Sequence, residues 1–85
     1  MEIAVFDTYV YKPGGQLMHF DILVQNGESL ERVLAFGKQY LTQKGLVDIE
    51  LSTKECKFCH IESPSENITS MVQENGYAII EMQGC

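Results

Sequence analysis

Positive charge is scarce in this 85-residue sequence, which has six Lys and Arg residues against twelve Asp and Glu residues and a formal charge of −6. The basic residues are scattered along the chain and form no patch: Lys12, Arg32, Lys38, Lys44, Lys54 and Lys57. Proteins that bind nucleic acids need clustered positive charge to displace counterions from phosphates, and anionic membrane surfaces attract the same kind of cluster. We therefore expect no nucleic-acid partner and no membrane partner.

The sequence also lacks a long hydrophobic run, a basic leader segment and low-complexity tracts. No apolar run approaches the ~20 residues that span a bilayer, and the opening MEIAVFDTYV is unlike a signal peptide. We therefore expect a cytoplasmic protein, in which thiols stay reduced, so its three cysteines are free or metal-bound. Because separate cores normally need ~100 residues each, we expect a single domain over residues 1–85.

A β-hairpin is predicted at the start of the chain, where two alternating segments, 3–11 and 16–25, flank Lys-Pro-Gly-Gly at 12–15. A slip of one residue would turn the apolar side of one strand to solvent. Pairing Lys12 with Gln16 across a three-residue loop avoids this. It places on one face Ala4, Phe6, Thr8 and Val10 with Met18, Phe20, Ile22 and Val24.

Two helices and two more strands are predicted after the hairpin. Ser29 is a suitable N-cap for a helix that ends before Gly45, and Ser63-Pro64-Ser65-Glu66 reads as a capping box for a second helix. Residues 56–61 and 77–82 are predicted strands, although 52–55 could form a helical turn. The order β-β-α-β-α-β predicts an α+β fold with a four-stranded, mainly antiparallel or mixed sheet and both helices packed on one face.

Several motifs along the chain carry a family resemblance. DTYV at 7–10, HFDILV at 19–24, ECKFCH at 55–60, GYAII at 76–80 and the final Gly-Cys occur in this order. Together they resemble a family of small bacterial proteins that is catalogued as a domain of unknown function, number two thousand and twenty-four in that series. The resemblance covers essentially the whole chain and implies a compact α+β domain. It implies no activity and no catalytic residues.

The pentapeptide CKFCH at 56–60 is the stretch most suggestive of chemistry. Its spacing fits c-type haem attachment, a thiol redox pair or half of a zinc site. Haem would require export, and a redox pair would require a helix starting at the first cysteine. Zinc is the strongest chemical hypothesis and the one cofactor that we expect if there is any. Its expected ligands are Cys56, Cys59, His60 and Cys85, with His19 as a further candidate.

The zinc hypothesis depends on the backbone of this pentapeptide. In a regular strand Cys56 and Cys59 would point to opposite faces about 10 Å apart, at ~3.3 Å per residue, which is too far to share an ion. Cys56 would then share a face with Phe58 and His60, and Cys59 with Ile61. The cysteines would simply be part of the fold, since thiols are often buried as small apolar groups.

A second cluster follows from the hairpin register, on the face opposite the apolar set. Asp7, His19 and Asp21 fall side by side there, beside Tyr9, and could act as a general acid–base group or bind a divalent ion. A polar face that is merely solvated explains them equally. This face also carries apolar residues, which suggests a protein partner or a homo-oligomer. The residues expected to form this contact are Val5, Tyr9, Tyr11, Leu17 and Leu23.

Three hypotheses of function remain. The leading one is a non-catalytic binding or interaction module that uses this second face. The first alternative is a zinc-stabilised domain built on Cys56 and Cys59. The second alternative is a small enzyme built on His19 with Asp7 and Asp21, or a thiol-redox protein. We assign no catalytic residue from the sequence.

Overall fold

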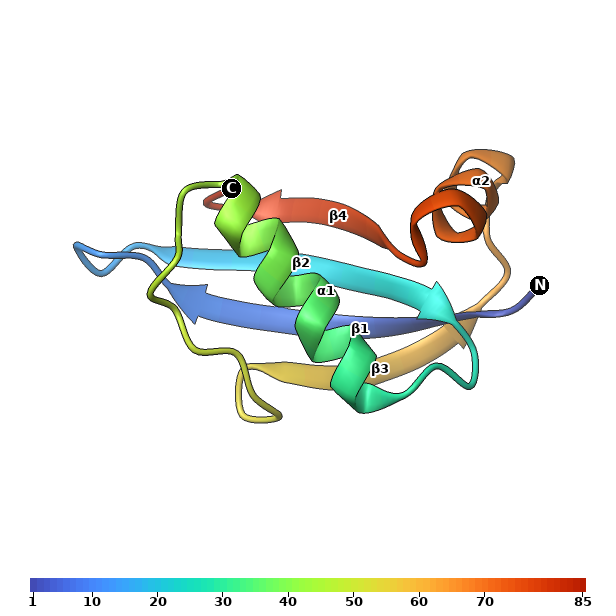
Figure 1. The fold of residues 1–85 in the computed structure, drawn as a ribbon, viewed down its shortest axis with the longest axis horizontal. Coiled ribbons are helices and arrows are strands. Elements are labelled where there is room, and N and C mark those ends of the chain that lie inside the picture. Colours follow the sequence, from blue (N-terminus) through green and yellow to red (C-terminus); the bar gives the residue numbers. More distant parts are fainter.

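The computed structural model describes residues 1–85 and contains one sheet of four strands and two helices (Figure 1). The elements are β1 (Ile3–Tyr11), β2 (Leu17–Gln25), α1 (Leu30–Gln43), β3 (Cys56–Glu62), α2 (Glu66–Asn75) and β4 (Ala78–Gln83). The strand order is β3-β1-β2-β4, and every neighbouring pair is antiparallel. The predicted α+β fold and element order are confirmed. Neither helix is both long and apolar enough to cross a membrane.

The hairpin register is the one that the apolar pattern requires. The backbone N–H of Lys12 donates to the carbonyl of Gln16 at 2.9 Å, which closes the three-residue loop. Phe6 consequently lies opposite Ile22, and Asp7 lies opposite Asp21. The even-numbered residues of both strands therefore face the same side of the sheet.

Helix α1 covers this side, which we call the helix face, and runs across the strands in Figure 1. Ser29 caps the helix by accepting a hydrogen bond from the backbone N–H of Arg32 at 3.2 Å. The core between α1 and the sheet includes the fully buried Phe20 and Val33, and Leu51 of the following loop closes it. Tyr40 also donates to the carboxylate of Glu81 at 2.5 Å, which ties α1 to β4.

Gly37 lies where α1 approaches the sheet most closely. A Cβ atom at this position would overlap the side chain of Leu51 and lie 2.8 Å from Cδ1 of Ile22. Helix propensity alone would make Gly37→Ala stabilising by about 1 kcal/mol. Overpacking costs about 1–3 kcal/mol, so we expect a net loss of about 1 kcal/mol in the free energy of unfolding.

Urea denaturation of Gly37→Ala checks this expectation, with Lys38→Ala on the exposed side of the same helix as the control. The control is expected to change the free energy of unfolding by less than about 0.5 kcal/mol. A stabilised Gly37→Ala protein would show that the helix has room to move away from the sheet.

Helix α2 differs from the sequence prediction in two respects. Its N-cap is Ser65, which accepts from the backbone N–H of Ile68 at 3.2 Å, so the capping box predicted at Ser63 does not form. Its buried side, with Val72, packs against the odd-numbered residues of the sheet. The expectation that both helices share one face is therefore wrong in this detail. The second apolar cluster joins Ile3, Val5, Leu23, Ile68, Val72 and Ala78.

The second face of the sheet is thus divided into two parts. Helix α2 covers the part beside the start of β1, near the N-terminus in Figure 1. Val5 and Leu23, which were expected to contact a partner, are buried beneath it. We call the remainder the open half. It includes Asp7, Tyr9, Tyr11, Leu17, His19, Asp21, Ile80 and Met82, together with Lys57 of β3, which lies opposite Asp7.

Candidate functional site

Three side chains from the two central strands meet on the open half. His19 Nε2 lies 3.7 Å from Oδ1 of Asp21 and 3.9 Å from Oδ1 of Asp7. Possible donor atoms of all three residues lie within 4.8 Å of one another. Asp7 and Asp21 are directly opposite each other in the ladder, so the confirmed register itself brings this cluster together.

The cluster is more buried than a solvated sheet face. Asp21 is only 7% exposed. Its Oδ1 atom and His19 Nε2 are both shielded from water and have no hydrogen-bond partner. The ring of Tyr9 stacks on the imidazole, with 4.0 Å between centroids and 10° between planes. Since more than about 90% of buried polar groups are paired in proteins, two unpaired atoms facing each other suggest a site for a ligand.

The electrostatics follow from this burial. Desolvation, assisted by the neighbouring carboxylate of Asp7, raises the pKa of Asp21 to about 7. Desolvation and the same two carboxylates also raise the pKa of the Cys59 thiol above its usual range. A cation placed between Asp7 and Asp21 would relieve this repulsion. The site is therefore suited to positive charge.

The CKFCH pentapeptide forms β3, and a bulge interrupts its pairing with β1. Val5 lies opposite His60 and Phe6 lies opposite Phe58, which leaves Cys59 as the extra residue. An extra residue shifts the alternation of side chains, so Cys59 and His60 lie together toward the second face. His60 Nδ1 is 3.1 Å from Cys59 Sγ, and its Nε2 is 3.0 Å from the Glu62 carboxylate. The expected alternation, with Cys56 and His60 on one face, is wrong beyond the bulge.

The four ligands predicted from the sequence do not all meet: Cys59 and His60 are in contact, whereas Cys56 and Cys85 lie apart from them. Cys56 is buried in the core on the helix face, and burial raises the pKa of its thiol. Cys59 and His60 lie toward the second face, while Cys85 Sγ contacts the backbone carbonyl of His19 at 3.4 Å. The cluster of three possible metal ligands in the structure is instead Asp7, His19 and Asp21. All three cysteines are free.

A hollow of about 290 Å³ adjoins the cluster where α2 meets the sheet. Its polar lining includes the carboxylates of Asp21 and Glu62 and the N-cap Ser65. The rest of the lining is apolar: Ile3, Leu23, Pro64, Ile68, Ile80 and Met82. Sequence reasoning missed Glu62 and Met82 as site residues, because nothing in the sequence places α2 on the second face.

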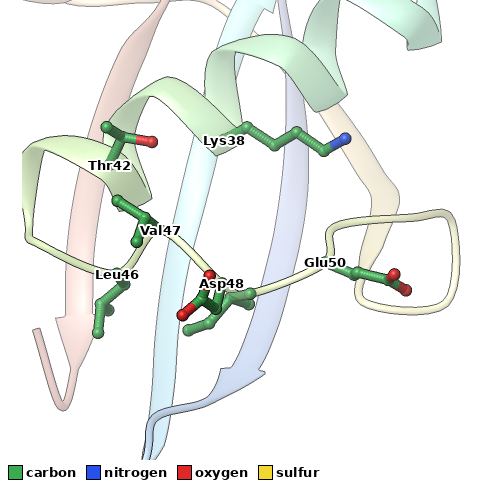
Figure 2. A pocket seen from close by; sticks show the side chains of 7 residues that line it. Lys38, Thr42, Leu46, Val47, Asp48 and Glu50 are labelled. Atoms are coloured by element: carbon green, nitrogen blue, oxygen red, sulfur yellow. The ribbon is translucent and has the colours of Figure 1, made fainter.

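Another pocket, of about 310 Å³, lies between α1 and the loop that follows it (Figure 2). Figure 2 shows Lys38 and Thr42 on the helix above the loop that carries Asp48 and Glu50. It is remote from the acidic cluster, and none of the residues lining it has an unpaired buried side-chain atom. The hollow and cluster on the second face are therefore the stronger candidate.

Comparisons with known proteins agree with the fold. A family model described as "Domain of unknown function (DUF2024)" matches residues 1–82. The NMR structure of protein NE1680 from Nitrosomonas europaea is 35% identical in sequence and superposes with a TM-score of 0.88. That match covers 100% of this chain and 99% of that chain. No match was found among curated proteins.

Proposed function

Since this chain belongs to the DUF2024 family, we propose from its own residues that it is a non-catalytic binding module for a basic segment of a partner protein. The hollow on the second face receives a lysine or arginine side chain of that segment. The observation that carries this proposal is the lining of the hollow. It combines apolar walls with two carboxylates and contains no Lys, Arg or His.

Lysine and arginine side chains match such a lining, because an apolar stem carries the cationic head group. The stem would lie along Ile68, Ile80 and Met82, and the head group would reach Asp21 and Glu62. The volume of about 290 Å³ lies at the lower end of the ~300–1,000 Å³ that is usual for pockets holding drug-sized ligands. The hollow therefore has room for one inserted side chain.

The charge of the hollow supports a basic ligand in spite of the nearby helix. The N-terminus of α2, at Ser65, contributes a partial positive charge of about half a unit. When ionised, the carboxylates of Asp21 and Glu62 together carry two negative charges. The net potential of the hollow is then negative, and a cation is favoured.

Exposed apolar side chains around the hollow provide contact area for the rest of the segment. Met82 is 53% exposed and Tyr9 is 46% exposed, with Ile80 and Tyr11 beside them on the open half. Aromatic residues and methionine are enriched in protein interfaces. A second copy of this chain is the weaker candidate for the partner, since each copy carries a formal charge of −6. On the composition described above, we place this partnership in the cytoplasm.

An NMR titration with a short peptide containing one lysine tests the proposal, with the same peptide acetylated at that lysine as the control. We expect the lysine peptide to shift the amide signals of Asp21, Glu62 and Ile68. Glu62→Gln is expected to weaken binding by about tenfold, because a charge-assisted contact contributes about 1.5–3 kcal/mol when well formed and less when exposed.

Glu50→Gln, in the pocket of Figure 2, is the matched control variant and is expected to bind as the original protein does. Equal binding of the acetylated peptide would contradict the proposal, as would equal weakening by both variants. Sedimentation of the protein without peptide tests whether the partner is a second copy of this chain. A stable dimer that buries Tyr9 and Met82 would identify a second copy as the partner instead.

A further inference from the structure

We propose that Asp7, His19 and Asp21 form a zinc-binding site on the open half of the second face. This inference goes beyond the proposed function, although both sites use the carboxylate of Asp21. Cys56, Cys59, His60 and Cys85 do not form this site. Its ligands come from the two central strands, where the register fixes their positions.

The distances between the donor atoms suit a metal better than hydrogen bonds. His19 Nε2 lies 3.7 Å and 3.9 Å from the two carboxylate oxygens, beyond hydrogen-bond length. Two ligands about 2.1 Å from a tetrahedral zinc ion are roughly 3.4 Å apart. All three donor atoms lie within 4.8 Å of one another, so side-chain movements of about an ångström would bring them to coordination distance.

The unpaired atom of Asp21 is a second and independent indication. Asp21 is only 7% exposed. Its Oδ1 atom has no hydrogen-bond partner and lies 3.7 Å from His19 Nε2. An ion between them would give both atoms a partner. Two carboxylates and a neutral imidazole carry a charge of −2, which a divalent cation neutralises. Burial then no longer opposes ionisation of the pair.

The mixture of donors favours zinc over the alkaline-earth ions. Magnesium and calcium prefer oxygen ligands alone, whereas zinc takes imidazole nitrogen and carboxylate oxygen together. Three protein ligands leave a fourth position. Two soft donors lie near the cluster: Cys59, toward the same side of the sheet, and Cys85, whose Sγ lies 3.4 Å from the backbone carbonyl oxygen of His19.

Calorimetric titration of metal-free protein with zinc chloride tests the site, and the chain offers a matched pair of variants because it has two histidines. We expect the original protein to bind one equivalent. His19→Gln should weaken binding by at least about 100-fold, as expected when a ligand is lost, whereas His60→Gln should stay within about threefold. Magnesium chloride in place of zinc should give no binding heat.

If His19→Gln does not fold, as judged by circular dichroism, Asp7→Asn replaces it, since Asp7 is half-buried and takes no part in the core. Absence of zinc binding to the original protein would overturn the proposal. So would loss of binding in His60→Gln alone, which would place the ion at Cys59, His60 and Glu62. Glu62→Gln distinguishes the two proposals, because it should weaken the lysine peptide and retain zinc.

Discussion

Asp21→Asn is expected to stabilise the metal-free protein by about 2 kcal/mol at about pH 8 and to abolish its zinc binding. Burial raises the pKa of Asp21 from 3.8 to about 7, so the ionised carboxylate destabilises the fold. The groups that face it include Asp7 and Glu62, which oppose its ionisation, and His60, which favours it. Asparagine has nearly the same shape and no charge.

The sign of the effect follows from the two protonation states. Below the unfolded pKa of 3.8 Asp21 is protonated in both states, and the substitution should change little. Between 3.8 and about 7 the unfolded chain ionises first, so stability of the original protein falls as pH rises. Above about 7 the penalty is complete. Each unit of pKa corresponds to about 1.4 kcal/mol, and relaxation around the site reduces the total.

Urea denaturation at about pH 4 and about pH 8 measures this difference directly. Asp48→Asn, an exposed acid in the loop after α1, is the control and should change stability by less than about 0.5 kcal/mol. A destabilised Asp21→Asn protein at the higher pH would show that the carboxylate is well hydrogen-bonded, contrary to the geometry described. A variant that gains stability and loses zinc would identify Asp21 as a binding residue.

Leu23→Ala is expected to destabilise the protein by about 3 kcal/mol, within the range for leucines buried in a core. Leu23 is 4% exposed and packs with Val72 of α2 on the second face. Its removal leaves a cavity that the sheet cannot close. Thermal or urea unfolding of the purified variant checks the magnitude.

Leu17→Ala is a closely matched control, since Leu17 lies on the same strand and the same face but outside the cover of α2. This substitution should lower the free energy of unfolding by less than about 1 kcal/mol, because the side chain of Leu17 is only partly buried. Equal losses from the two substitutions would show that α2 does not divide the second face. The hollow between α2 and the sheet would then not form as described.

The central hairpin could be predicted from sequence because strand alternation has a period of two. Only an even register places Phe6 and Phe20 on the same side, and the same parity puts Asp7, His19 and Asp21 on the other. The sequence therefore predicts that these three side chains lie together. Their burial could not be predicted, since that depends on the stacked ring of Tyr9 and on the twist and packing of neighbouring strands.

The side chosen by α2 could not be predicted. Its apolar stripe is short, with Ile68 and Val72, and such a stripe fits either face of an open sheet. A tertiary contact determines which face α2 packs against. Ile3, Val5 and Leu23 are apolar residues on the otherwise polar face, and α2 shields them from water. Val5 and Leu23 were expected to contact a partner, whereas α2 of the same chain buries them.

The CKFCH segment shows a different limit. Sequence reasoning considered a turn or a regular strand, and the structure has a strand with a bulge between them. One extra residue keeps Cys56 in the core and brings Cys59 and His60 to the side of the acidic cluster. Bulges have weak sequence signatures, so a shift of this kind is found only when the pairing with β1 is known.

The most direct test of the account is an NMR spectrum of the imidazole nitrogens recorded while zinc is added to metal-free protein. His19 and His60 are the two histidines of the chain, so each serves as the control for the other. We expect the Nε2 signal of His19 to shift on addition of one equivalent, while both nitrogens of His60 keep their positions. A spectrum in which His60 shifts and His19 does not would contradict a binding site formed by Asp7, His19 and Asp21.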